Sequence, residues 1–249
     1  MTTSFIHRYG PEIAHDYPVC AIEPGQKRPI GKEWQKHPLS PEECRDYPNE
    51  AAGVGIMCGQ GDNPVYAVDV DVYADADCAH AIYQMIEEVT GQADLPYRVG
   101  NYPKLLVPLI GTEVGWKKMT TAWYEKDGLR SRVELLGDGQ QFVAAAIHPD
   151  TKQPYEWHGE RLGGSLIDIP EAMPIVSLAK LQDILRKAEK ILEAHGWQKA
   201  DGGSEVKGTE ISADELAPQY PIGATIEEAR TWLADMPGKD DYDVWFKVG

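Results

Sequence analysis

The stretch Val68-Asp69-Val70-Asp71-Val72 determines how we interpret the rest of this chain. Residues 65–72 alternate small apolar side chains with Tyr and Asp and follow an Asn-Pro pair, which predicts a β-strand. Side chains at positions i and i+2 of a strand point to the same face. Asp69 and Asp71 should therefore project together, while the valines between them point into the core.

Two carboxylates on one strand face repel each other unless a cation lies between them. Asp is disfavoured in strands, so its presence at alternate positions of a valine-rich strand needs a chemical reason. Mg²⁺ prefers hard oxygen ligands and commonly takes one or two carboxylates together with substrate phosphates. We therefore predict a divalent-metal site at Asp69 and Asp71, the alternative being an exposed polar strand face.

Other common ion and nucleotide motifs do not fit the sequence. An EF-hand loop counted from Asp69 would place Ala74 where the turn glycine belongs and His80 where the bidentate glutamate belongs. Asp75 is instead expected to cap the helix that follows it. The glycines within residues 53–61 lack dinucleotide-binding spacing, and the sequence contains no Walker-type phosphate loop.

Composition limits the class of protein. The 249-residue chain has 42% hydrophobic residues, enough for a core and for one large domain or one domain plus a smaller one. Its formal net charge of −16 argues against a general nucleic-acid coat, but it does not exclude an enzyme with a small basic patch. No apolar run reaches the length of a membrane helix, and the four widely spaced cysteines favour a reducing cytoplasm.

Strand-like and helix-like segments alternate in the first half of the chain and strands cluster afterwards, which predicts an α+β or mixed α/β domain ending near Pro170. A helix or turn is expected from residue 12. Further strands are expected over residues 17–22, 54–57, 105–110, 132–136 and 142–147. Apolar periodicity predicts helices over residues 78–90 and 177–195, each followed by a glycine.

We expect residues 1–172 to form the main domain. An amphipathic helix within residues 173–197 should pack on this domain or follow it, and residues 198–222 should form a polar linker. Residues 223–249 should begin a helical domain. Because the final apolar run carries no stop signal, we expect the chain to be the front part of a longer protein, a natural short C-terminus being the alternative.

The order of motifs resembles the N-terminal bifunctional primase/polymerase domain of phage and plasmid replication proteins, within the archaeo-eukaryotic primase superfamily. Four segments carry the resemblance, namely residues 17–34, 53–71, 98–105 and 133–157. Residues 237–249 resemble the start of the helical region that joins such primases to a helicase. The resemblance implies a primase-like catalytic core, with a mixed sheet and an RRM-like half, followed by C-terminal helices.

The resemblance also assigns roles to acidic residues. It implies that Asp69 and Asp71 bind metal and that Glu134, on a neighbouring strand, is the third acid. Asp138 competes for this third role, but its Gly-Asp-Gly setting favours a turn. Three carboxylates can hold two ions, Mg²⁺ or Mn²⁺, that activate the primer 3′ oxygen and stabilise the leaving pyrophosphate.

Basic residues are expected to bind phosphate. Many family members have Ser-Gly-Gly-x-His in the second motif, with the histidine on the nucleotide phosphates. Here Lys104 lies near that place and can neutralise phosphate as a point charge, the alternative being a solvated strand end. Arg98 is expected to assist. His148 could reach a triphosphate or a template phosphate, or it could be polar surface.

Lys27, Arg28 and Trp34 are expected to contact template or nucleotide, since basic and aromatic side chains together suit single-stranded nucleic acid. Trp34 could equally close a core.

The resulting hypothesis is a template-dependent DNA primase/polymerase that uses NTPs or dNTPs on single-stranded DNA. It would work beside a C-terminal helicase region in the cytoplasm of a bacterial host cell, with no membrane partner. The first alternative is a non-catalytic nucleic-acid or replisome-binding module on the same fold, motivated by the missing histidine and the acidic charge. The second is another metal-dependent phosphoryl-transfer enzyme, such as a nuclease, because paired acids alone do not select the reaction.

Overall fold

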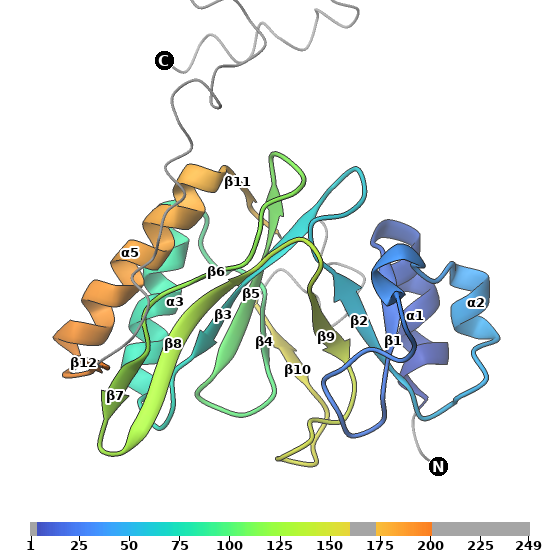
Figure 1. Cartoon of the computed structure of the whole chain (residues 1–249), viewed down its shortest axis with the longest axis horizontal. Helices are drawn as coiled ribbons and strands as arrows, with labels where there is room; N and C mark the ends of the chain where they lie inside the picture. The colour runs from blue at the N-terminus through green and yellow to red at the C-terminus, as the bar shows by residue number, and fades with distance from the viewer. Residues whose placement is uncertain (1–3, 160–172, 201–249) are drawn as a thin grey trace, which may run out of the picture. The chain divides into compact units, whose positions relative to one another are not determined.

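The computed structural model describes residues 4–159 and 173–200 (Figure 1). The chain separates into two units, Met1–Val206 and Lys207–Gly249, and all described residues belong to the first. This part confirms the predicted α+β class, because it combines a large, mainly antiparallel sheet with a small antiparallel sheet and helices. The expected boundary at residue 172 and the segments beyond residue 200 lie outside the described residues.

The large sheet has the aspartate-bearing strand near its centre. In spatial order its strands are β10 (Glu156–His158), β4 (Tyr97–Val99), β5 (Leu105–Gly111), β3 (Val65–Asp71), β8 (Leu129–Leu136), β7 (Tyr124–Lys126) and β12 (Gln198–Lys199). Two short strands extend it, β6 (Met119–Thr120) beside β8 and β11 (Ile175–Val176) beside β5. The β11–β5 pair is parallel and the other pairs are antiparallel.

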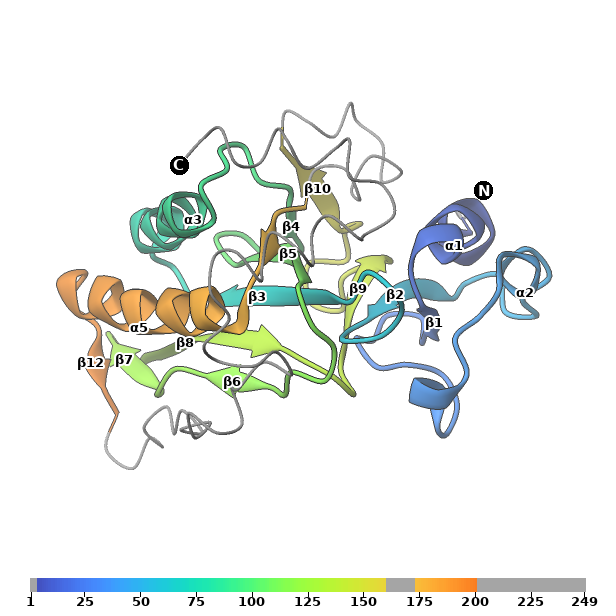
Figure 2. The ribbon, with the colours of Figure 1, turned by 90° about the horizontal axis from the view of Figure 1, so that it is seen from above.

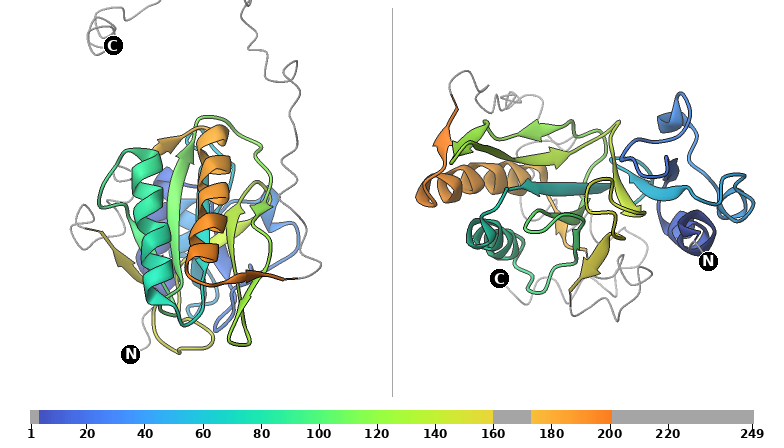
Figure 3. Two further views of the ribbon diagram at one scale, coloured as in Figure 1. Left: turned by 90° about the vertical axis from the view of Figure 1, so that its left-hand side faces the viewer. Right: turned by 90° about the horizontal axis from the view of Figure 1, so that it is seen from below.

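Two long helices, α3 (Ala76–Thr90) and α5 (Leu178–Ala194), lie side by side over one face of the large sheet (Figure 3). Val68 and Val70 of β3 are buried in the same core cluster as Ile82 of α3 and Leu185 of α5. Each such side chain contributes about 1.5–3 kcal/mol when fully buried. The valine face of β3 is therefore the structural face, and its aspartates point away from the helices.

The small sheet lies beside the other face of β3. Its strands follow the order β1 (Val19–Ile22), β2 (Gly53–Met57) and β9 (Gln141–Ala145). Helices α1 (Phe5–Asp16) and α2 (Pro41–Arg45) and the 3-10 helix η1 (Trp34–Lys36) accompany it, away from α3 and α5 (Figure 2). Ile56 and Phe142 share a second core cluster with Ala67 of β3, so the two sheets are joined through buried apolar contacts.

The glycines that precede β3 have a packing role. A Cβ on Gly53 would lie 2.6 Å from the Ala146 Cβ, and a Cβ on Gly55 would lie 2.7 Å from Gln141 Oε1. The approach at Gly53 is closer than a methyl group allows, so β2 needs glycine there for its contact with the segment that includes β9; a Cβ at Gly55 would require the Gln141 side chain to shift. Their irregular spacing reflects sheet packing and not a dinucleotide-binding turn.

Helix α1 is longer than the sequence predicts, because it begins at Phe5 whereas a helix or turn was expected only from residue 12. Gly10 and Pro11 lie inside it, and both residues have poor helix propensity. Gly10 lets α1 approach α2 closely, since a Cβ there would lie 2.9 Å from the Cys44 Cβ. In the described ranges, no helix combines the length and the apolar character needed to cross a bilayer.

Candidate active site

Asp69 and Asp71 project from β3 into a pocket of about 260 Å³, at the place where the two sheets meet. Both aspartates are half-buried, whereas Val68 and Val70 are buried on the opposite face, as the alternation predicted. The pocket collects charged side chains and an imidazole from distant parts of the sequence. These residues are Lys27, Asp69, Asp71, Arg98, Lys104 and His148.

The paired aspartates carry an electrostatic cost in the absence of a bound cation. Burial and the neighbouring Asp71 raise the pKa of Asp69 to about 6, and Glu134 acts in the same direction. Two half-buried carboxylates on one strand face are a donor set that a hard divalent cation stabilises. The residues therefore fit Mg²⁺ or Mn²⁺.

Lys104 forms an ordered ion pair at this site. Its Nζ lies 3.1 Å from Asp71 Oδ1 and 3.4 Å from the centre of the Tyr73 ring, and its side chain is only 15% exposed. Burial alone would lower the pKa of Lys104, but Tyr73 and Asp71 outweigh it and raise the pKa above the ordinary lysine value. The lysine is thus a largely buried, charged group with two partners, unlike a solvated strand end.

Arg98 and Lys27 add two further cations to the pocket. The Arg98 guanidinium donates to the Val143 carbonyl and stacks on the Tyr155 ring at 4.4 Å from its centre. Its Nε atom is buried and has no hydrogen-bond partner in the described part of the chain. Burial and the nearby Lys104 lower the pKa of Lys27. Crowded, partly desolvated cations of this kind bind an anion favourably.

His148 is buried, so it is not the polar surface residue that was one alternative. Its Nδ1 accepts hydrogen bonds from the backbone N–H groups of Asp150, at 3.2 Å, and Thr151, at 3.3 Å. Burial and the charge of Lys27 lower the pKa of His148, which favours the neutral ring. Because Nδ1 accepts, the proton of that neutral ring lies on Nε2, which is a hydrogen-bond donor.

Gly100 leaves the space that this histidine needs. A Cβ on Gly100 would lie 2.7 Å from His148 Cδ2 and 2.3 Å from Tyr155 Cε1. Thr151 Oγ1 also donates to the Gly100 carbonyl over 3.1 Å. The loop that carries Lys104 is therefore packed directly against the histidine and the ring that supports Arg98.

Glu134 lies opposite Asp69 in the β3–β8 register and is only 6% exposed. Its carboxylate is held by Arg132 and by Lys118, whose Nζ lies 3.0 Å from Oε1. It is not among the described residues that line the pocket. Asp138, its rival for the third acidic position, is paired at 2.5 Å with Lys117 and is likewise absent from that lining. The assignment of Glu134 as a metal ligand stays a prediction.

Arg28 and Trp34 lie outside the pocket lining, whereas Lys27 belongs to it. Arg28 is 72% exposed and pairs with Glu23 at 2.7 Å. Trp34 is half-buried against the cluster that contains Met57, which fits the alternative that it closes a core. Their role in template contact stays a prediction.

The sequence interpretation missed Tyr73, Tyr155 and Gln141. Tyr73 stands two residues after Asp71, so the same alternation that placed the aspartates could have found it. Gln141 donates from Nε2 to the Lys27 carbonyl over 2.8 Å, and Tyr155 supports Arg98. These two contacts join segments that are far apart in sequence, and no local pattern indicates them.

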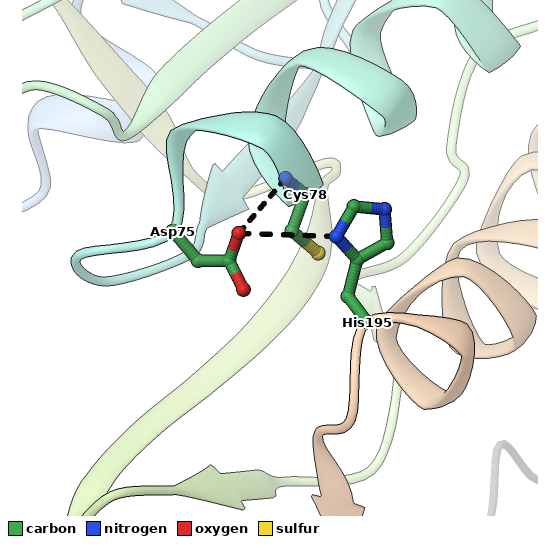
Figure 4. A group of neighbouring side chains, drawn as sticks. All are labelled: Asp75, Cys78 and His195. Carbon is green, nitrogen blue, oxygen red and sulfur yellow. Dashed lines mark hydrogen bonds and ion pairs between the residues drawn. The ribbon is translucent and has the colours of Figure 1, made fainter.

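A second polar cluster joins the start of α3 to the end of α5 (Figure 4). Asp75, Cys78 and His195 each offer one possible metal-ligand atom, all within 4.8 Å of one another. Asp75 Oδ1 accepts from the Cys78 backbone N–H at 3.0 Å, which is the predicted helix cap, and lies 3.8 Å from His195 Nδ1.

Asp75 already has a cation partner in this cluster. Its Oδ2 accepts from Lys126 Nζ at 2.7 Å and from Trp197 Nε1 at 3.1 Å. Burial raises the pKa of the Cys78 thiol to about 12, which disfavours the thiolate that a metal would bind. A metal ion would have to displace the Lys126 ammonium, so the contacts describe a helix cap and an ion pair.

Comparison with known proteins agrees with this geometry. The family model described as "Bifunctional DNA primase/polymerase, N-terminal" matches residues 12–174, which is more than half of the chain. Among curated proteins, no match to the chain is found. The matched range includes both pocket aspartates and the basic residues around them. The chain therefore belongs to the bifunctional DNA primase/polymerase N-terminal family.

Proposed function

We propose that this chain is a template-dependent DNA primase/polymerase that transfers nucleotides from NTPs or dNTPs by a two-metal mechanism. Further, we propose that it forms the N-terminal part of a phage or plasmid primase-helicase. The observation that carries the activity is the pocket in which Asp69 and Asp71 face Lys27, Arg98 and Lys104. Paired carboxylates beside clustered cations suit a metal-bound triphosphate, because each set of charges has a matching partner on that ligand.

The chain's own groups would divide the work as follows. Asp69 and Asp71 would hold Mg²⁺ or Mn²⁺, with Glu134, which lies opposite Asp69 on the adjacent strand, as the third acid. When bound, these ions would supply the positive charge that activates the primer 3′ oxygen and stabilises the leaving pyrophosphate. Arg98 and Lys104 bind triphosphate oxygens.

The neutral His148 contributes without a charge. Since its Nδ1 already accepts two backbone hydrogen bonds, its Nε2–H can donate to a phosphate oxygen. Burial lowers the pKa of His148, which favours the neutral imidazole in this arrangement. His148 would then orient the triphosphate and would not need to exchange a proton during the reaction.

Single-stranded DNA would approach the pocket past Lys27 and the exposed Arg28. Lys27 lines the pocket, and Arg28 follows it in the same turn. Phosphate contacts of this kind do not read sequence, so they suit an enzyme that copies any template. The basic region needed is small, which is compatible with the net charge of −16.

Primer extension on a single-stranded template tests the proposal, with each nucleotide set in Mg²⁺ and in Mn²⁺. Asp69→Asn and Asp71→Asn should each lower extension by at least about 100-fold, because each removes a metal ligand. Asp183→Asn, on the outer surface of α5, is the matched control and should extend normally. Undiminished extension by both pocket variants at normal stability would refute the assignment.

The products of the same primer-extension reactions also distinguish the alternative functions. Asp71 and Glu134 are already ion-paired, which is the observation that favours a non-catalytic nucleic-acid-binding module. Such a module would bind single-stranded DNA and incorporate no nucleotide with either metal. A nuclease would instead shorten the primer or the template.

A further inference from the structure

The contact between Lys104 and Asp71 has a consequence for metal binding. Among the described residues, it is the only ion pair formed by Asp69 or Asp71. The ammonium lies 3.1 Å from Asp71 Oδ1, on one of the two carboxylate oxygens that could bind a divalent cation. Two positive centres close to one carboxylate repel each other, so the lysine and the metal compete for Asp71.

The backbone around Lys104 is fixed while its side chain can move. Its backbone N–H donates to the Asn101 carbonyl over 3.1 Å, and β5 begins at the next residue. The lysine stem has four methylene groups and places a compact point charge, which can move toward a nearby anion without any backbone change.

Tyr73 positions the ammonium. The ring centre lies 3.4 Å from Lys104 Nζ, a favourable cation–π distance. The Tyr73 backbone N–H donates to Ser131 Oγ over 3.1 Å, which fixes the residue beside the end of β3. Lys104 is thereby held at this position by two attractive partners, the Asp71 carboxylate and the Tyr73 ring.

We propose that Lys104 is an internal counter-ion that closes the metal site until a nucleotide triphosphate draws the ammonium away from Asp71. This inference rests on the proposed function, because it takes the triphosphate as the ligand of the pocket. Metal alone would bind weakly, since it must displace the lysine. Metal and nucleotide together would bind cooperatively, and by linkage each would raise the affinity for the other by the same factor.

Mn²⁺ binding to the full chain without nucleotide, measured by electron paramagnetic resonance of the free ion, tests this. Lys104→Met removes the charge at similar volume and should tighten Mn²⁺ binding by about tenfold, within the range typical of coupled sites. Lys104→Arg keeps the charge and should bind Mn²⁺ like the parent protein. Adding Asp71→Asn to Lys104→Met should abolish the gain.

Lys27→Met is the matched comparison, because Lys27 lines the same pocket without an ion pair to Asp71. An equal gain in Lys27→Met would mean that only the overall pocket charge matters, and it would overturn the inference. An unchanged Mn²⁺ affinity in Lys104→Met would do the same. Lys104→Gln gives a second variant if Lys104→Met does not fold, as judged by its melting temperature.

Addition of a non-hydrolysable nucleoside triphosphate completes the experiment. It should tighten Mn²⁺ binding in the parent protein by more than in Lys104→Met, because the variant has no ammonium to relocate. Equal tightening in both proteins would contradict the inference. If extension survives Asp69→Asn and Asp71→Asn, the proposed function fails; if extension needs both aspartates and Lys104→Met leaves Mn²⁺ binding unchanged, only the counter-ion inference fails.

Discussion

Asp69 on β3 lies directly opposite Glu134 on β8, but the two carboxylates have different surroundings. Asp69 lines the pocket, whereas Glu134 does not and is held by Lys118 and Arg132. Asp69 and Glu134 thus point to the same face of the sheet. Among the described ion pairs, Glu134 has cation partners and Asp69 has none.

Glu134→Gln tests the third acid. We expect weaker Mn²⁺ binding and at least about tenfold slower extension, because the substitution removes a ligand charge. It should also lower the free energy of unfolding by roughly 1–3 kcal/mol, since Lys118 and Arg132 lose their partner. Adding Lys118→Met should restore part of the stability but none of the extension. Normal Mn²⁺ affinity in Glu134→Gln would assign the residue a purely structural role.

Asp69→Asn should stabilise the metal-free protein while it abolishes metal binding. The folded-state pKa of Asp69 is raised from 3.8 to about 6, so the folded form binds the proton more tightly than the unfolded chain. The parent therefore loses stability as pH rises from about 4 to 6, and the loss is complete above that range. The variant escapes this loss and should gain on the order of 1–3 kcal/mol at pH 8.

Chemical unfolding of both proteins at several pH values in EDTA measures this difference. The gain of Asp69→Asn should shrink as pH falls from about 6 and should approach zero below the unperturbed pKa of 3.8, where both states of the parent carry the proton. Asp183→Asn serves as the surface control. A gain that does not change with pH would show that Asp69 does not have the raised pKa.

Arg98→Met and Arg28→Met should separate nucleotide from template binding. Arg98 lines the pocket, so Arg98→Met should weaken triphosphate binding by about 10- to 100-fold, the value of a hydrogen bond to a charged group. Arg28 is exposed outside the lining, so Arg28→Met should weaken only single-stranded DNA binding and lower its salt dependence by about one phosphate contact. Titrations with each ligand at several salt concentrations measure both effects. The opposite pattern would contradict the two assignments.

Asp75→Asn should destabilise the protein without changing its chemistry. The variant weakens the cap of α3 and removes the charge that pairs with Lys126, at a cost of about 1–3 kcal/mol. Extension per folded molecule should stay normal. Melting temperatures of the parent protein and Asp75→Asn, measured with EDTA and with added Zn²⁺, provide the check. An equal drop in melting temperature under the two conditions fits an ion-paired cap. A loss that appears only with Zn²⁺ would identify Asp75, Cys78 and His195 as a metal site.

Local patterns predicted the parts of this fold whose side chains alternate strongly. The alternation around Asp69 located β3, and apolar periodicity located α3 and α5. Strands β4 and β10 have three residues each, which is too short for a period to be visible. They nevertheless shape the site, because β4 carries Arg98 and β10 pairs with it.

The sequence singled out the two aspartates and four basic residues that line the pocket, but it did not indicate which charges pair. The sequence indicated that Lys104 and Asp71 are both functional, yet nothing local indicates that they contact each other. No local pattern indicates that Lys118 pairs with Glu134 either. Such contacts depend on strand register and on the path of loops, which are properties of the whole sheet.

The two faces of β3 allow stability and chemistry to change independently. Val68 and Val70 anchor the strand in the helix-covered core, and Asp69 and Asp71 serve the pocket. If the pocket has the proposed function, substitutions at the acidic positions would alter or extinguish activity in a protein that still folds, which is a route by which relatives could evolve into inactive binding proteins. Deletion of a single residue from β3 offers no such route, because it would turn carboxylates into the core and valines into the pocket.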